Sequence, residues 1–132
     1  MNAINYLTSR FLLNILMALI FIHAWPAVAS ESTQVITLTL GDYHFTPDRI
    51  EVTAGQPVQL TLTNTDTITP HNFIMQDDAA GLDIDIDVSA GKTATIEFTP
   101  VIPGNYSFYC SKKLPFMKSH QGKGMEGTLT VK

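Results

Sequence analysis

Short stretches in which hydrophobic and polar residues alternate recur along most of the chain, and they restrict its fold more than any other feature. The alternation is clearest at residues 35–40 (Val-Ile-Thr-Leu-Thr-Leu) and 58–63 (Val-Gln-Leu-Thr-Leu-Thr). A period of two is typical of β-strands with one buried face. Further strands are expected at residues 50–53, 72–76, 93–98, 104–110 and 127–131.

Clusters of glycine and proline separate these runs, for example Thr46-Pro47-Asp48 and Ile102-Pro103-Gly104. Both residue types favour tight turns and end regular structure. No segment after residue 30 has the period of an amphipathic helix. Many short strands joined by such turns predict an all-β sandwich or barrel.

One segment, residues 77–87, combines this alternation with a high density of aspartate. Its acidic residues are interleaved with Leu82, Ile84 and Ile86. We expect an edge strand or an exposed loop, in which the charges discourage pairing with another sheet edge. The ligand order of an EF-hand calcium loop, with its central glycine and final glutamate, is absent.

The first 29 residues differ in composition from the rest of the chain and are predicted to be a signal peptide. One basic residue, Arg10, precedes an apolar run at residues 11–22, and Ala27-Val28-Ala29 matches a cleavage site. We expect cleavage after Ala29. The apolar run is shorter than the roughly 20 residues that span a bilayer, although an uncleaved N-terminal anchor is the alternative.

The remaining chain, residues 30–132, has the length of one domain. It carries seven basic and twelve acidic side chains, which argues against nucleic acid as a partner. We expect a monomer, periplasmic or secreted, with no stable membrane insertion after cleavage.

Cys110 is the only cysteine, so it cannot form an internal disulfide in an exported protein. An intermolecular bridge, a buried bystander and a metal ligand are the three explanations. The residues that follow favour the last. Cys110 ends a predicted strand, and the next loop carries His120 and Met125. Thiolate, imidazole and thioether form a soft ligand set that suits copper, and His71, directly after Pro70, is suitably placed to add a second imidazole.

Three stretches of the chain resemble the cupredoxins, the plastocyanin and pseudoazurin family of small copper proteins. They are residues 45–58, Pro70-His71-Asn72, and residues 120–127 (His-Gln-Gly-Lys-Gly-Met-Glu-Gly). The resemblance implies a Greek-key β-sandwich at residues 30–132 that binds one copper ion, cycling between Cu(I) and Cu(II). It also implies that Asn72 joins the two ligand segments by hydrogen bonds. The implied ligands are His71, Cys110 and His120 in the equatorial plane and Met125 as the weak axial ligand.

The chain departs from the plastocyanin-like pattern between Cys110 and His120, where it has nine residues, 111–119. We call this segment the insert. It is basic, and it brings a second thioether, Met117, which competes with Met125 for the axial role. The match of His-x4-Met-x-Gly to the family favours Met125. The longer loop could change the geometry, potential or solvent access of the copper site.

The resemblance and the four-ligand set predict a one-electron carrier, whose protein redox partner is acidic and docks on Lys112, Lys113 and Lys118. The alternative is a copper-binding protein for tolerance or delivery, which meets a copper-trafficking partner. An enzyme is not expected, because only three histidines follow residue 29 and oxidases of the wider copper family need more. The third of these histidines, His44, is expected at the surface or on a sheet face rather than at the metal. Met75 is expected to fill a gap in the core.

Overall fold

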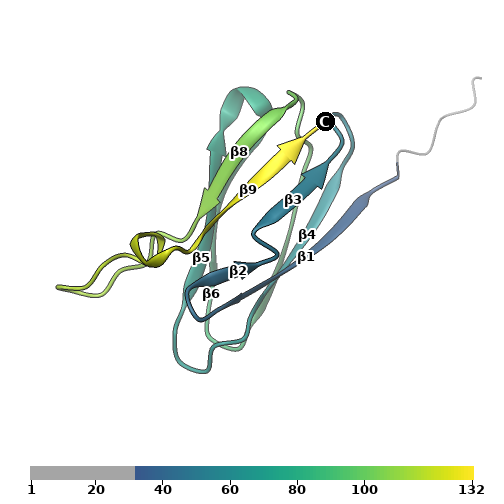
Figure 1. Ribbon diagram of the computed structural model, residues 1–132. Coiled ribbons are helices and arrows are strands. Elements are labelled where there is room, and N and C mark those ends of the chain that lie inside the picture. Colours follow the sequence, from purple (N-terminus) through teal and green to yellow (C-terminus); the bar gives the residue numbers. More distant parts are fainter. Residues whose placement is uncertain (1–31) are drawn as a thin grey trace, which may run out of the picture. The chain divides into compact units, whose positions relative to one another are not determined.

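A computed structural model describes residues 32–132, which form two β-sheets that face one another (Figure 1). The four-stranded sheet has the order β2 (His44–Thr46), β1 (Gln34–Gly41), β4 (Val58–Asn64) and β7 (Thr93–Phe98). The five-stranded sheet has the order β3 (Arg49–Val52), β9 (Glu126–Val131), β8 (Gly104–Tyr109), β5 (His71–Asp77) and β6 (Leu82–Val88). This confirms the all-β, Greek-key sandwich predicted from the sequence.

The predicted strands are present, with differences at their ends. The strand predicted for residues 104–110 stops at Tyr109, because the Cys110 N–H bonds to the Met125 carbonyl outside the strand ladder. Strand β2 was not predicted, since three residues are too few to show a period. The acidic segment forms β6 at the edge of the five-stranded sheet, as expected, preceded by a 3-10 turn, η1 (Asp78–Ala80).

The core lies between the sheets and is filled by alternate residues of the strands. Phe73 and Phe108 stack with ring centroids 5.0 Å apart, and Phe45 meets both edge-on. Met75 is buried among them, as predicted. Other large side chains with no exposed surface include Leu38, Leu40, Leu60, Leu62, Leu82 and Leu129. The described residues therefore contain one hydrophobic core between the two sheets.

The predicted signal peptide, residues 1–29, lies outside the described residues. Within residues 32–132, no helix is long and apolar enough to cross a membrane.

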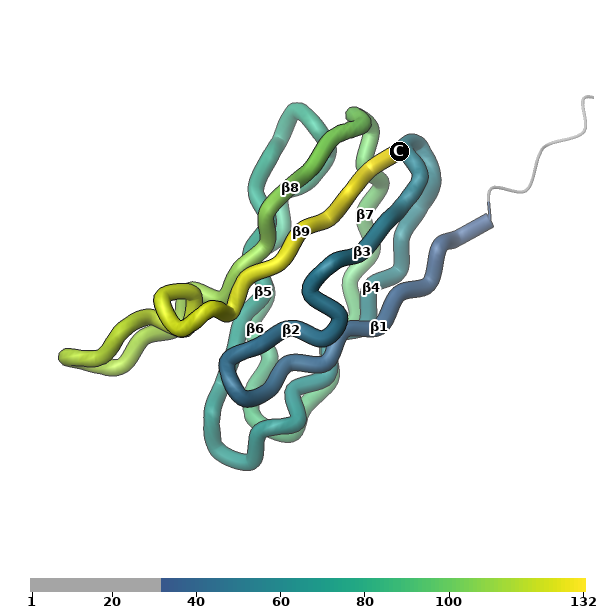
Figure 2. Tube along the Cα trace, in the orientation of Figure 1, coloured from purple at the N-terminus to yellow at the C-terminus, as the bar shows by residue number. Residues whose placement is uncertain are grey.

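The five-stranded sheet brings three strand ends together. Strand β5 is antiparallel to β8, with Ile74 opposite Tyr109, and β8 is antiparallel to β9, with Tyr109 opposite Glu126. The first residue of β5, the last of β8 and the first of β9 therefore lie at the same end of the sheet. Figure 2 shows the chain between β8 and β9 projecting beyond this end.

Candidate metal centre

Three of the predicted ligands, His71, Cys110 and His120, converge at this end of the sheet. His71 begins β5, and Cys110 follows β8 directly. The two Nδ1 atoms of His71 and His120 lie 3.1 Å apart, and the Cys110 Sγ lies 3.4 Å from the Nδ1 of His120 and 3.8 Å from that of His71. All three residues are buried. The structure thus places one thiol and two imidazole nitrogens around a common point.

These distances fit a single bound metal ion. Sulfur and nitrogen ligands sit about 2.0–2.3 Å from a first-row metal, so two ligands of one ion lie roughly 3–4.5 Å apart. All three distances fall in this range. Soft thiolate and imidazole donors together select copper or zinc over calcium and magnesium, whose preferred ligands are oxygens.

Backbone hydrogen bonds around His120 keep it close to Cys110 despite the nine residues of the insert. The His120 N–H donates to the Lys112 carbonyl at 2.8 Å, and the Gln121 N–H donates to the Cys110 carbonyl at 3.0 Å. These bonds close the base of the insert, so His120 is held beside Cys110 as it would be in a short loop. The insert therefore lengthens the chain without separating the two donors.

Met125 and Met117, the two thioether candidates, lie in different surroundings. Met125 has no exposed surface, and its N–H donates to the His120 carbonyl at 3.0 Å, while its carbonyl accepts from the Cys110 N–H at 3.1 Å. The 3-10 turn η2 (Gln121–Lys123) connects His120 to this position. Met117 is 46% exposed on the insert. Met125 therefore belongs to the backbone frame that holds the donors, and Met117 does not.

Asn72 joins the two ligand segments, in agreement with the role that the resemblance implies. Its Oδ1 accepts from the Ser111 N–H at 2.8 Å, and its Nδ2 donates to the Ser111 Oγ at 3.0 Å. Its backbone N–H points at the Cys110 Sγ at 3.4 Å. Hydrogen bonds of this kind fix ligand orientation and stabilise a thiolate.

Asp66 orients His71, a contact that the sequence analysis missed. The Asp66 Oδ2 lies 2.8 Å from the His71 Nε2, and its Oδ1 accepts from the Asp42 N–H at 3.1 Å. Burial raises the pKa of Asp66, but the hydrogen bonds from His71 and Asp42 outweigh this and lower it. An ionised carboxylate only accepts, so Nε2 must carry the proton, which leaves the lone pair of the neutral ring on Nδ1.

Tyr43 packs against the same imidazoles and was also missed. Its ring meets His120 edge-on with centroids 4.8 Å apart, and the Lys123 Nζ lies over the Tyr43 ring, 3.7 Å from its centroid. Tyr43 has a φ of 61° and Asp42 a φ of 50°, values that non-glycine residues seldom adopt. No sequence motif predicts this turn at Asp42 and Tyr43. His44, in contrast, is exposed on β2, as predicted.

Burial shifts the ionisation of two donors in the same sense, toward their neutral forms. It raises the pKa of the Cys110 thiol, and it lowers the pKa of His120, which the neighbouring His71 lowers further. Without a metal, the site therefore favours a neutral thiol at Cys110 and a neutral imidazole at His120. A bound cation would instead stabilise the Cys110 thiolate.

Comparison with known proteins agrees with this geometry. Residues 13–131 match the Cupredoxin-like domain family. The plastocyanin minor isoform of Arabidopsis thaliana is 34% identical over 100 residues, which cover 70% of this chain and 53% of the relative, so this chain spans about half the length of that relative. Plastocyanin of Dryopteris crassirhizoma is 30% identical over 105 residues, covering 70% of this chain and 92% of the relative.

Among solved structures, dithionite-reduced auracyanin of Roseiflexus castenholzii superposes with a TM-score of 0.60 at 25% identity, covering 75% of this chain and 97% of auracyanin. Fold, converging donors and sequence similarity agree. The chain belongs to the cupredoxin-like family.

Proposed function

We propose that this protein binds one copper ion through His71, Cys110, His120 and Met125 and acts as a one-electron carrier. The observation that carries the proposal is the convergence of one thiol and two imidazole nitrogens in a buried site. Family membership and the preference of soft donors for copper support it. Met125 is preferred to Met117 as the thioether ligand because it is buried within the same backbone frame.

Copper would supply the one-electron couple, Cu(I)/Cu(II), and the protein would supply a fixed ligand geometry. Asp66 holds the His71 ring, Asn72 holds the Cys110 loop, and backbone bonds hold His120 and Met125. Ligands that are held on both sides of the site rearrange little when the charge changes. This rigidity suits electron transfer better than a reaction that remodels a substrate, and we propose no enzymatic activity.

His120 is the donor through which electrons would enter and leave. It is 5% exposed, whereas His71 and Cys110 have no exposed surface. The surface beside it is a hollow of about 250 Å³, lined by Tyr43, Ile68, Thr69, Pro70, Lys112, Lys113, Leu114 and His120. We propose that a protein redox partner approaches over this hollow, in the periplasm or outside the cell.

The test is a titration of the protein with Cu(II), followed by visible absorption. We expect an intense thiolate-to-copper band that saturates at one equivalent and is bleached reversibly by a reductant. Cys110→Ser should abolish the band, and His120→Ala should shift or weaken it. His44→Ala is the control, because His44 is exposed and is not among the converging donors, and the thiolate band should persist.

The same preparation separates electron transfer from copper delivery. An electron carrier keeps its copper through many redox cycles in the presence of a chelator. Rapid loss of Cu(I) to the chelator, or the absence of any thiolate band, would contradict the electron-transfer proposal and favour copper tolerance or delivery.

A further inference from the structure

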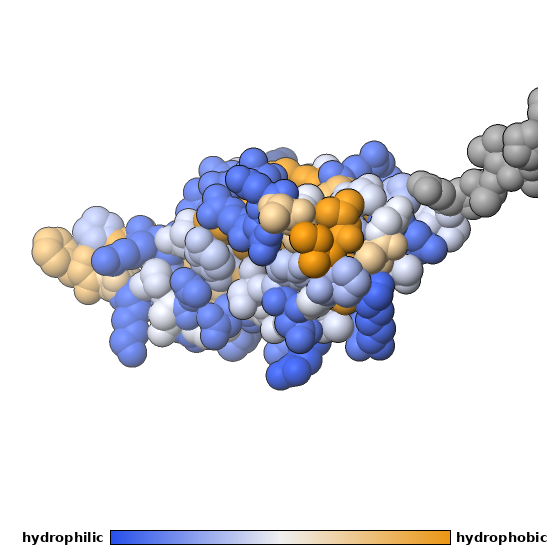
Figure 3. Space-filling view, turned by 90° about the horizontal axis from the view of Figure 1, so that it is seen from above, coloured by the Kyte–Doolittle hydropathy of each residue, from blue (hydrophilic) through white to orange (hydrophobic). Residues whose placement is uncertain are grey.

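The insert presents a hydrophobic tip to solvent. Phe116 is 107% exposed, Leu114 is 59% exposed and Met117 is 46% exposed. With Pro115 they form four consecutive apolar residues, which we call the tip. In Figure 3 the projecting end of the molecule carries hydrophobic residues, next to strongly hydrophilic ones. Isolated exposed hydrophobic residues are common, but a run of them on a projection marks an interaction site.

The backbone holds the tip in this exposed position. The Met117 N–H donates to the Leu114 carbonyl at 3.2 Å, and Phe116 has a φ of 62°. A bulky residue at positive φ is a strained outlier, and such strain persists mainly where it serves a function. At this turn the side chain of Phe116 is fully exposed.

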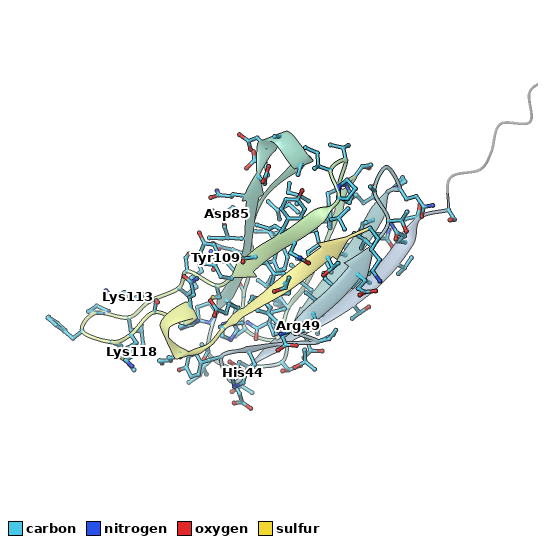
Figure 4. The ribbon with its side chains drawn as sticks, turned by 45° about the horizontal axis from the view of Figure 1, so that its top comes forward. His44, Arg49, Asp85, Tyr109, Lys113 and Lys118 are labelled. Carbon is cyan, nitrogen blue, oxygen red and sulfur yellow. The ribbon has the colours of Figure 1, made fainter. Side chains whose placement is uncertain are left out.

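Positive charge surrounds the tip. Residues 111–125 contain four lysines and no aspartate or glutamate, although acidic residues outnumber basic ones in the chain. Lys112 pairs with Asp87 at 2.6 Å, and Lys123 lies over Tyr43. Lys113 and Lys118 have no ion-pair partner among residues 32–132. They lie on opposite limbs of the insert, so they flank the tip from both sides (Figure 4).

We infer that the insert docks this protein on an anionic lipid surface. Leu114, Pro115 and Phe116 carry no side-chain hydrogen-bonding group, so they can enter an apolar layer without losing a side-chain hydrogen bond to water. Lys113 and Lys118 would then lie at the level of the lipid headgroups, where basic residues are attracted to negative charge.

The lysines of the insert, rather than the domain as a whole, give the docking a direction. Asp77 and Asp78 lie at the far end of the sandwich, because β5 runs from the metal centre to Asp77, but Asp66, Asp87 and Glu126 lie at the metal-centre end. An anionic surface therefore attracts the insert itself. Because the base of the insert is bonded to His120, docking keeps the metal centre close to the membrane.

The experiment uses protein that begins at Ser30, the predicted start of the mature chain, so that the apolar run at residues 11–22 does not itself bind lipid. Metal-free protein is sedimented with phosphatidylcholine vesicles, with and without phosphatidylglycerol. We expect weak, salt-sensitive binding to the anionic vesicles only. Phe116→Ala should weaken it about tenfold through lost burial. The Lys113→Gln/Lys118→Gln double variant should weaken it roughly twenty-five-fold, which is about fivefold for each lysine.

Matched controls are Val35→Ala and Lys132→Gln, an exposed apolar residue and an exposed lysine at the other end of the sandwich, and both should bind as the parent does. Circular dichroism and thermal melting check that every variant is folded. Failure to bind anionic vesicles, or equal binding by the Phe116→Ala variant, overturns the inference. So does insert-dependent binding to polyglutamate without vesicle binding, which would assign the insert to an acidic protein partner. None of these outcomes depends on copper.

Discussion

Replacing Asn72 with alanine tests how the two ligand segments are held together. Asn72 is 4% exposed. The substitution removes the acceptor for the Ser111 N–H at 2.8 Å and the donor to the Ser111 Oγ at 3.0 Å. It keeps the backbone N–H that points at the Cys110 Sγ. The folded core is untouched, so the effect measures the connection between the segments.

Each hydrogen bond contributes about 0.5–1.5 kcal/mol net, so the two together amount to roughly 2 kcal/mol. In a domain of about 100 residues, this lowers the melting temperature by roughly 10 °C. Urea unfolding of the metal-free protein measures the change, and we expect the slope of the transition to stay constant. With copper bound, the thiolate band should remain, but the metal should be lost faster to a chelator.

Two variants make the measurement specific. Asp85→Ala removes only the longer contact from the Asn72 Nδ2, at 3.4 Å to an exposed carboxylate, and should change stability by less than about 0.5 kcal/mol. Ser111→Ala removes only the hydroxyl bond and should have an intermediate effect. If Asn72→Ala also costs less than about 0.5 kcal/mol, the side chain does not join the segments and the reasoning fails.

Three further predictions concern the site and its scaffold. Asp66→Ala, which leaves the His71 Nε2–H without its acceptor, should weaken metal binding about 10–100-fold in a chelator competition, and Asp66→Asn should recover part of the loss. Because burial lowers the pKa of His120 below its ordinary 6.5, the unfolded chain binds the proton first, so the metal-free protein should lose stability as the pH falls through and below about 6.5. His120→Gln should flatten that part of the urea-derived stability curve, and an unchanged curve would contradict the assignment. Gly127→Ala should cost about 1–3 kcal/mol, because a Cβ there overlaps the Phe108 ring, and wild-type stability would show that the strand relaxes freely.

The strands and the ligands could be predicted because their signals are local. The period of two at residues 58–63 reflects burial of one face, and β4 buries Val58, Leu60 and Leu62. Cys110 stood out because it is the only cysteine and the next loop carries His120 and Met125, which are spaced from each other as in the family. Such signals need no knowledge of what packs opposite them.

The contacts of Asp66 and Tyr43 carried no comparable signal. Asp66 precedes His71 by five residues in a loop whose path depends on the buried Asn64, whose amide bonds to the Thr69 and Val88 carbonyls. Tyr43 reaches His120 through an unusual backbone turn. Neither contact follows from spacing, because the loop that carries Asp66 crosses from one sheet to the other, and Tyr43 meets His120 only in the folded chain.

The insert also has features that can be read from the sequence and others that require the folded structure. Its length, lysines and apolar residues are visible in the sequence, and its length suggested that it could alter the metal site. Only the folded structure shows that backbone bonds close its base, return His120 to Cys110, and leave Phe116 in solvent. The sequence by itself thus determined the sandwich and its candidate ligands, since periodicity and ligand type are properties of neighbouring residues. The orientation of the ligands and the direction of the insert follow only from the tertiary structure, because they depend on how the loops fold and on contacts such as that of Asn72 with Ser111 between segments distant in the chain.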